Sequence, residues 1–200
     1  NCPLLGETLI PVVVAPSREA CTPVVGFRHI SGILQWTPYA QARYIATLVD
    51  GSHMSFDEVH KLIGIDRRGV AALYREQAIT TQAQRLGIAT GNLEASFSLL
   101  QVAMSSPKIR EFVGAPLGTR LGPGEDPIPE DKVAELEELL GYIFGNGELE
   151  PKIHDSRQIP QLANVIADPR GLEALRSGET LDVAKQKIAD AAVDPKERLR

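Results

Sequence analysis

The sequence predicts a mostly α-helical protein that begins with a small α/β segment and continues through a helix-turn-helix domain into a C-terminal helical region. Three observations predict this fold class. Apolar residues recur at helical spacing over most of residues 37–194, a β-branched run lies near the N-terminus, and a stretch with four glycines and four prolines occupies residues 114–129. The predicted boundaries of the three parts are residues 1–36, 37–115 and 128–194.

The N-terminal segment contains two candidate strands. Residues 9–14 read Leu-Ile-Pro-Val-Val-Val, and the prolines at positions 11 and 16 suit a strand at the edge of a sheet. Residues 22–26, Thr-Pro-Val-Val-Gly, are the second candidate. These two runs are the reason to expect an α/β segment over residues 1–36.

The first helix is predicted to begin at Thr37 and Pro38. Threonine is a good N-cap, and proline is favoured at the first helical position because its missing N–H would be unpaired there anyway. Gly51 ends this helix. Its apolar stripe consists of Tyr39, Ala42, Ile45, Ala46 and Val49.

Residues 54–75 have the spacing of a helix-turn-helix motif. Two short helices that cross steeply share a core through one apolar stripe each. Gly64 is placed at the corner, where a left-handed backbone conformation is needed and glycine adopts it without a Cβ clash. His60 departs from the motif, which usually has a small residue there, and we expect it to loosen the crossing. The predicted inner face consists of Val59, Ile63, Gly64, Ile65, Val70 and Leu73.

The second helix of this motif lies in the major groove of DNA, with its leading residues at the base edges. The motif therefore predicts double-stranded DNA as the partner. Three guanidinium groups and two small residues on the outward side suit close approach to a groove. The predicted DNA-contacting residues are Ser55, Asp66, Arg67, Arg68, Ala71, Ala72 and Arg75.

Beyond the helix pair the chain is helical again. Helices are expected over residues 93–105, 108–113, 130–144, 158–167 and 181–192, with a short one after Pro169. Nine carboxylates and one lysine lie between Glu125 and Glu150, so this face should avoid DNA. We expect the C-terminal helices to serve packing or assembly, with a homodimer as the form that binds two half-sites.

Composition sets limits on the function. The chain has 200 residues, 43% of them hydrophobic and 24% charged, as in a soluble globular protein. The net charge of −5 requires any DNA contact to come from a local patch. Two cysteines without metal-ligand or disulfide spacing suit a reducing cytoplasm, and no apolar run reaches the roughly 18 residues of a membrane span. We expect a cytoplasmic, nucleoid-associated protein with no membrane partner.

No catalytic or metal site is predicted. Ser156, next to His154 and Asp155, is better explained as part of a helix cap, because a nucleophilic triad is assembled in space. The four histidines show no pair at metal-ligand spacing.

The order of three features resembles the ParB-type partition proteins and their ParB/sulfiredoxin-like relatives. The three features are the Ile-Pro-Val run within residues 9–14, the Pro-x-x-x-Ala helix start at Pro38, and the helix-turn-helix. The resemblance covers residues 9 to about 80. It implies DNA partition or transcriptional regulation as the function, and CTP or another nucleotide as a ligand. The family's Gly-Glu-Arg-Arg phosphate-binding motif is not in this chain, and the spacing of its second motif is not matched. Arg28 and His29 are then the candidate nucleotide-binding residues.

Residues 54–75 could also be an ordinary helix pair in an all-α protein that does not bind DNA. Two further functions stay open. The first is an enzyme of the ParB-like superfamily, a nucleotide-hydrolysing switch or nuclease, whose catalytic motif lies upstream of this chain. The second is a structural adaptor that uses the acidic face of residues 130–150 against a basic partner. Salt-dependent binding to DNA separates the adaptor from the DNA-binding protein.

Overall fold

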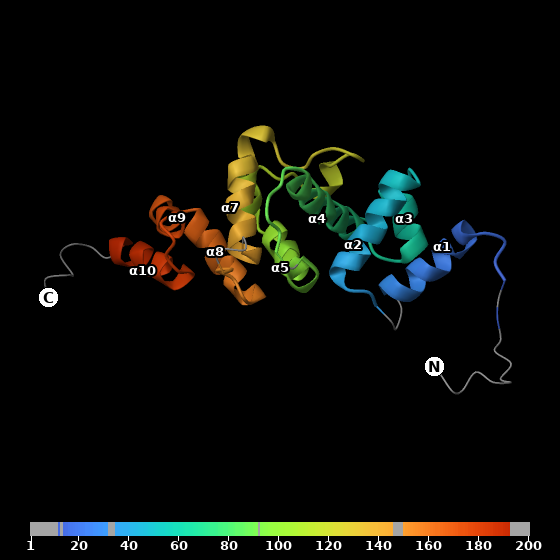
Figure 1. Ribbon diagram of the computed structural model, residues 1–200, viewed down its shortest axis with the longest axis horizontal. Helices are drawn as coiled ribbons and strands as arrows, with labels where there is room; N and C mark the ends of the chain where they lie inside the picture. Colours follow the sequence, from blue (N-terminus) through green and yellow to red (C-terminus); the bar gives the residue numbers. More distant parts are fainter. Residues whose placement is uncertain (1–11, 13, 32–34, 92, 146–149, 193–200) are drawn as a thin grey trace, which may run out of the picture.

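The structure of the chain is a computed structural model that describes residues 12, 14–31, 35–91, 93–145 and 150–192. Within these residues all regular secondary structure is helical, with ten α-helices and no strand. The helices are spread along the long axis of the molecule, with α1 near one end and α10 near the other (Figure 1). The predicted mostly helical class is confirmed for these residues, and the predicted α/β character of the N-terminal segment is not.

The second candidate strand is wrong, because residues 22–26 lie in helix α1 (Arg18–Gly26). The Ser17 side chain caps this helix by accepting a hydrogen bond from the backbone N–H of Ala20. Contacts with neighbouring helices explain the difference. The Tyr44 hydroxyl of α2 donates to the carbonyl oxygen of Thr22 at 2.8 Å, so packing outweighs the β-preference of the local sequence.

The first candidate strand, at residues 9–14, lies mainly outside the described residues. Val12 and Val14, which are described, are exposed and belong to no strand.

The first half of the structure consists of α1, α2 (Pro38–Ala46), α3 (Phe56–Ile63) and α4 (Arg67–Arg85). Helices α1 and α2 each continue into a π-helical turn, at Phe27–Ser31 and Thr47–Gly51. Thr37 caps α2 as predicted, since its side chain accepts from the backbone N–H of Ala40 and Pro38 follows in the first turn.

The second half consists of helices that lie at or within a few residues of their predicted bounds. They are α5 (Leu93–Ser105), α6 (Pro107–Val113), α7 (Val133–Phe144), α8 (Ile159–Ile166), α9 (Pro169–Arg176) and α10 (Leu181–Ala192). Short 3-10 turns lie at Gly118–Arg120, Glu130–Lys132 and Ser156–Gln158.

One hydrophobic core joins the two halves. It is continuous from Ile30 to Ala184, and Phe97, Leu100 and Met104 of α5 are fully buried in it. Helix α4 is central, because it packs against α2 and α3 on the N-terminal side and against α5 on the other (Figure 1). The position of α4 decides how much of its surface is free to meet a partner.

No helix among the described residues is long and apolar enough to cross a membrane. The same residues contain no group of three histidine, cysteine, aspartate or glutamate side chains that could hold a metal ion.

Candidate nucleic-acid interface

The predicted helix pair is formed by α3 and α4. At the start of α3, the Ser55 hydroxyl accepts from the backbone N–H of Glu58, and the Glu58 carboxylate accepts from the backbone N–H of Ser55 at 2.8 Å. This reciprocal capping box satisfies two of the backbone donors that a helix start leaves unpaired. Ser55, predicted to contact DNA, therefore has a structural role in fixing where α3 begins.

Gly64 adopts the left-handed conformation predicted for it, with φ 76° and ψ 9°, and ends α3. Four of the six residues predicted for the inner face are buried, whereas Gly64 is exposed and Ile65 is half-buried. Val59, Ile63 and Val70 are fully buried, and Leu73 is nearly so. The close packing of these residues fixes the angle between the two helices.

His60 does not leave the turn open. Its Nδ1 lies 2.6 Å from the carbonyl oxygen of Ile65, on the far side of the corner from α3. Because a carbonyl oxygen only accepts, Nδ1 must carry the proton in this contact. The histidine thus bridges the two ends of the turn.

The start of α4 presents the charged residues that the sequence predicts. Asp66 is the N-cap, and its carboxylate accepts from the backbone N–H of Gly69 at 3.0 Å. Arg67 and Arg68 follow and are exposed. The Arg67 Nε contacts the Asp57 carboxylate at 3.1 Å, with the two side chains 51% and 61% exposed. An exposed pair of this kind contributes little free energy, so the Arg67 guanidinium can exchange Asp57 for a phosphate.

Two residues predicted to face outward are instead buried. Ala71 is fully buried and Arg75 is 4% exposed, while Ala72 is partly exposed. This corrects the predicted outward face beyond the first turn of α4: neither Ala71 nor Arg75 can reach DNA in this structure.

The 114–129 segment covers this part of α4. Gly118 packs so closely on α4 that a Cβ there would come within 2.9 Å of the backbone nitrogen of Ala72. Farther along, the Tyr74 hydroxyl accepts from the backbone N–H of Gly124 at 2.8 Å and donates to the Asp50 carboxylate. Burial and Asp50 raise the pKa of Tyr74 to about 12, so the phenol stays protonated and can serve both partners.

The same segment pairs with the last turns of α4. The Gln82 amide donates to the carbonyl oxygen of Ile128 at 2.7 Å and accepts from the backbone N–H of Ile128 at 3.0 Å. Arg85 forms an ion pair with Asp126. The stretch rich in glycine and proline is therefore held along α4 over most of its length.

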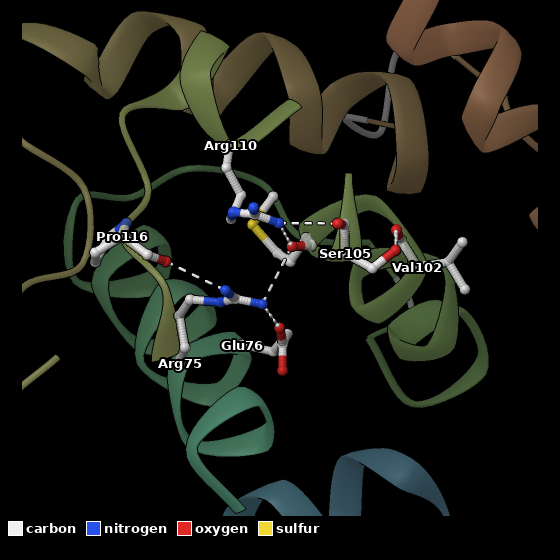
Figure 2. Close-up of polar contacts among 7 residues, drawn as sticks. Arg75, Glu76, Val102, Ser105, Arg110 and Pro116 are labelled. Atoms are coloured by element: carbon white, nitrogen blue, oxygen red, sulfur yellow. Dashed lines mark hydrogen bonds and ion pairs between the residues drawn. The ribbon is translucent and has the colours of Figure 1, made fainter. Parts of the chain in front are cut away.

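Arg75 is the centre of a buried polar cluster (Figure 2). Its guanidinium contacts the Glu76 carboxylate and donates to the carbonyl oxygens of Met104 and Pro116, each at 3.2 Å. Arg110 of α6 donates to the same Met104 carbonyl at 2.8 Å. These contacts join α4, α5, α6 and the 114–129 segment at one point.

Burial raises the pKa of Glu76 to about 7, against the opposing attraction of Arg75. One of its carboxylate oxygens contacts Arg75, and the other, Oε2, is buried without a hydrogen-bond partner among the described residues. The charged form of Glu76 is therefore poorly compensated, even beside a guanidinium.

The candidate nucleotide-binding residues lie in the π-helical turn after α1. Arg28 is exposed, whereas the His29 ring stacks on Trp36 with centroids 4.9 Å apart and an interplanar angle of 5°. Trp36 in turn meets the edge of Tyr44. This ring stack gives His29 a packing role between α1 and α2.

Sequence reasoning missed the side chains that join α4 and α6 to their surroundings, namely Tyr74, Gln82 and Arg110. Their partners lie 6 to 50 positions away, and the periodicity of one helix does not predict contacts at that distance.

Comparisons of the chain with protein-family models, with curated proteins and with solved structures found no match.

Proposed function

We propose that this protein binds double-stranded DNA through the first turn of α4, with Arg67 and Arg68 as the contacting residues. The observation that carries the proposal is the exposure of both guanidiniums at the N-terminal end of a helix that is largely buried from Val70 onward. A helix N-terminus carries a partial positive charge, which adds to the attraction of phosphate. Resemblance to ParB-type proteins supports a role in DNA partition or transcriptional regulation.

The α3–α4 pair supports this function by its rigidity. The capping box at Ser55, the left-handed Gly64 and the His60–Ile65 contact fix the corner, and Asp66 caps α4 directly before the two arginines. Side chains held on a rigid element meet base edges without a large cost in conformational entropy.

The burial of Ala71 and Arg75 narrows the proposed reading surface to one helical turn. One turn reaches few base pairs and few phosphates, so a single copy should bind weakly, with a small dependence on salt. Specific recognition then needs a second copy of the chain on a second half-site about one turn of DNA away.

The test is binding to a random-sequence duplex at several salt concentrations, followed by selection of bound sequences. In the double variant Arg67→Ala, Arg68→Ala, affinity should fall by roughly 1–3 kcal/mol for each arginine that reads a base. The salt slope should fall by about one for each arginine that binds a phosphate. Arg85→Ala, at the opposite end of α4, is the matched control and should leave both quantities unchanged. Equal binding by the double variant and the parent protein would refute the proposal.

A further inference from the structure

The 114–129 segment reverses direction beside the start of α4. Its successive contacts meet α4 first at Arg75, next at Ala71, and then back along the helix at Tyr74 and Gln82. The segment residues in these contacts are, in the same order, Pro116, Gly118, Gly124 and Ile128. The reversal lies at the 3-10 turn Gly118–Arg120, which packs on α4. Of the four contacts, that of the 3-10 turn lies nearest to the first turn of α4.

The 3-10 turn lies on the same face of α4 as an exposed arginine. A Cβ at Gly118 would come within 2.9 Å of the backbone nitrogen of Ala72, so the turn rests directly on the helix there. Ala72 follows Arg68 by four positions, a spacing that places two residues on one face of a helix. Four residues of α-helix span about 6 Å, which is less than the ~12 Å width of the major groove. A duplex that receives Arg68 in its groove therefore passes beside the 3-10 turn.

The 3-10 turn carries two side chains that are able to bind phosphate. Thr119 and Arg120 are both exposed, and within the described residues neither side chain has a hydrogen bond or an ion pair. Hydroxyl and guanidinium groups are among those that contact the DNA backbone most often. Arg120 differs in this respect from the three arginines of α4 that are paired with carboxylates, which are Arg67, Arg75 and Arg85.

Carboxylates in this region are already bound to other groups of the protein. The carboxylates are Asp57, Asp66 and Glu125, and their partners are Arg67, the backbone N–H of Gly69 and the backbone N–H of Gly122. None of these three carboxylates is bound to Arg120. The Arg120 guanidinium is therefore available to an external anion, for which a charge-assisted hydrogen bond is favourable.

We propose that the 3-10 turn is a second DNA contact, in which Thr119 and Arg120 bind a backbone phosphate beside the groove that receives Arg67 and Arg68; this contact presupposes the DNA binding proposed above. The segment that covers Ala71 and Arg75 then itself meets the duplex. Phosphate contacts fix the position and orientation of a protein on DNA without reading the sequence. The 3-10 turn thus sets how deeply the first turn of α4 enters the groove.

The packing of the segment favours a contact made in place over displacement of the segment by DNA. Displacement would expose Ala115, Leu121 and Ile128, which are buried in the hydrophobic core. It would also break both hydrogen bonds between Gln82 and Ile128. Apolar burial and paired polar groups of this kind are costly to undo. The covered residues of α4 therefore stay covered when DNA binds.

The experiment is titration of a random-sequence duplex with the full chain at about 50 to 200 mM salt, followed by fluorescence anisotropy. Arg120→Ala should lower the salt slope by about one, because one phosphate contact is lost. Over this fourfold range of salt, the parent protein should lose about 3.5-fold more affinity than the variant. Arg120→Lys should keep the slope, because the charge remains. Thr119→Ala should weaken binding by about threefold and leave the slope unchanged, because threonine is uncharged.

The matched control is Arg170→Ala, which removes an exposed arginine of α9, a helix that packs against α8 and α10. It changes the net charge by the same amount as Arg120→Ala and should leave the salt slope unchanged. An equal fall in slope for both variants would show a general charge effect and overturn the inference.

The double variant Arg67→Ala, Arg68→Ala separates this inference from the proposed function. If the double variant binds weakly and Arg120→Ala binds like the parent protein, the second contact is refuted and the proposed function stands. If the parent protein does not bind the duplex, both are refuted. Gln82→Ala, which releases the segment from α4 at Ile128, should not strengthen binding. Tighter binding by this variant, with an unchanged circular dichroism spectrum, would identify the segment as a shield and overturn the inference.

Discussion

The first turn of α4 and the rest of the same helix carry similar residues but lie in opposite environments. Arg67 and Arg68 are exposed, whereas Arg75, two turns later, is 4% exposed and bound to Glu76 and to two backbone carbonyls. The 114–129 segment makes the difference, because it covers α4 from Ala71 onward. A helix can therefore have a solvent-exposed end and a buried body, and the charge of its residues does not distinguish the two.

The largest effect is expected from Arg75→Ala. This change leaves a buried carboxylate and two buried carbonyls with fewer donors, so the free energy of unfolding should fall by about 3–5 kcal/mol. Urea denaturation measures it. Arg67→Ala is the control and should change stability by no more than about 0.5 kcal/mol, because its ion pair is exposed. Similar decreases for both variants would remove the distinction between the two parts of α4.

A smaller effect is expected from Gly118→Ala. The added Cβ would lie 2.6 Å from the carbonyl carbon of Ala71, so the 114–129 segment must shift away from α4. Overpacking of this kind costs about 2 kcal/mol. Gly141→Ala is the control, because its Cβ meets no described atom within 4 Å and the variant should gain rather than lose stability. A melting temperature for Gly118→Ala at or above that of the parent protein would contradict the close contact.

A third effect depends on pH. The pKa of Glu76 is raised from 4.5 to about 7 in the folded state, so the folded protein holds a proton there that the unfolded chain has released. The contribution of Glu76 to stability is therefore present below about pH 4.5 and is lost as the pH rises to about 7. Glu76→Gln should remove this slope from the free energy of unfolding, whereas Glu111→Gln, on the surface of α6, should not. Identical pH profiles for Glu76→Gln and the parent protein would show that folding does not change the pKa of Glu76.

The features that the sequence predicted correctly are local ones. Gly64 at the corner, Thr37 before Pro38, and the inner face of Val59, Ile63 and Val70 each follow from the geometry of one or two helical turns. Such features depend on residues at most a few positions apart.

The features that it missed depend on distant contacts. Residues 22–26 favour a strand by composition, yet Tyr44 holds them in a helix from 22 positions away. Arg75 has the spacing of an outward residue, yet Met104 and Pro116, 29 and 41 positions later, enclose it. The sequence predicted the exposure of the first turn of α4 but not the burial of the second turn. Periodicity identifies the residues that share one face of a helix, but it does not show which other segment covers that face.

The pairing of Gln82 with Ile128 has a consequence for how this chain can change. The Gln82 side-chain amide bonds both the N–H and the carbonyl of Ile128, as a residue on a neighbouring strand would. This pairing fixes Ile128 as the residue of the segment that lies opposite Gln82. Gly118 fixes a second register point at Ala71. An insertion between these anchors can bulge into solvent at the cost of the contact between Gly124 and Tyr74, whereas one that displaces either anchor slides the whole segment along the helix. This part of the protein must preserve the positions of the two anchors along α4 more than the identity of the residues between them.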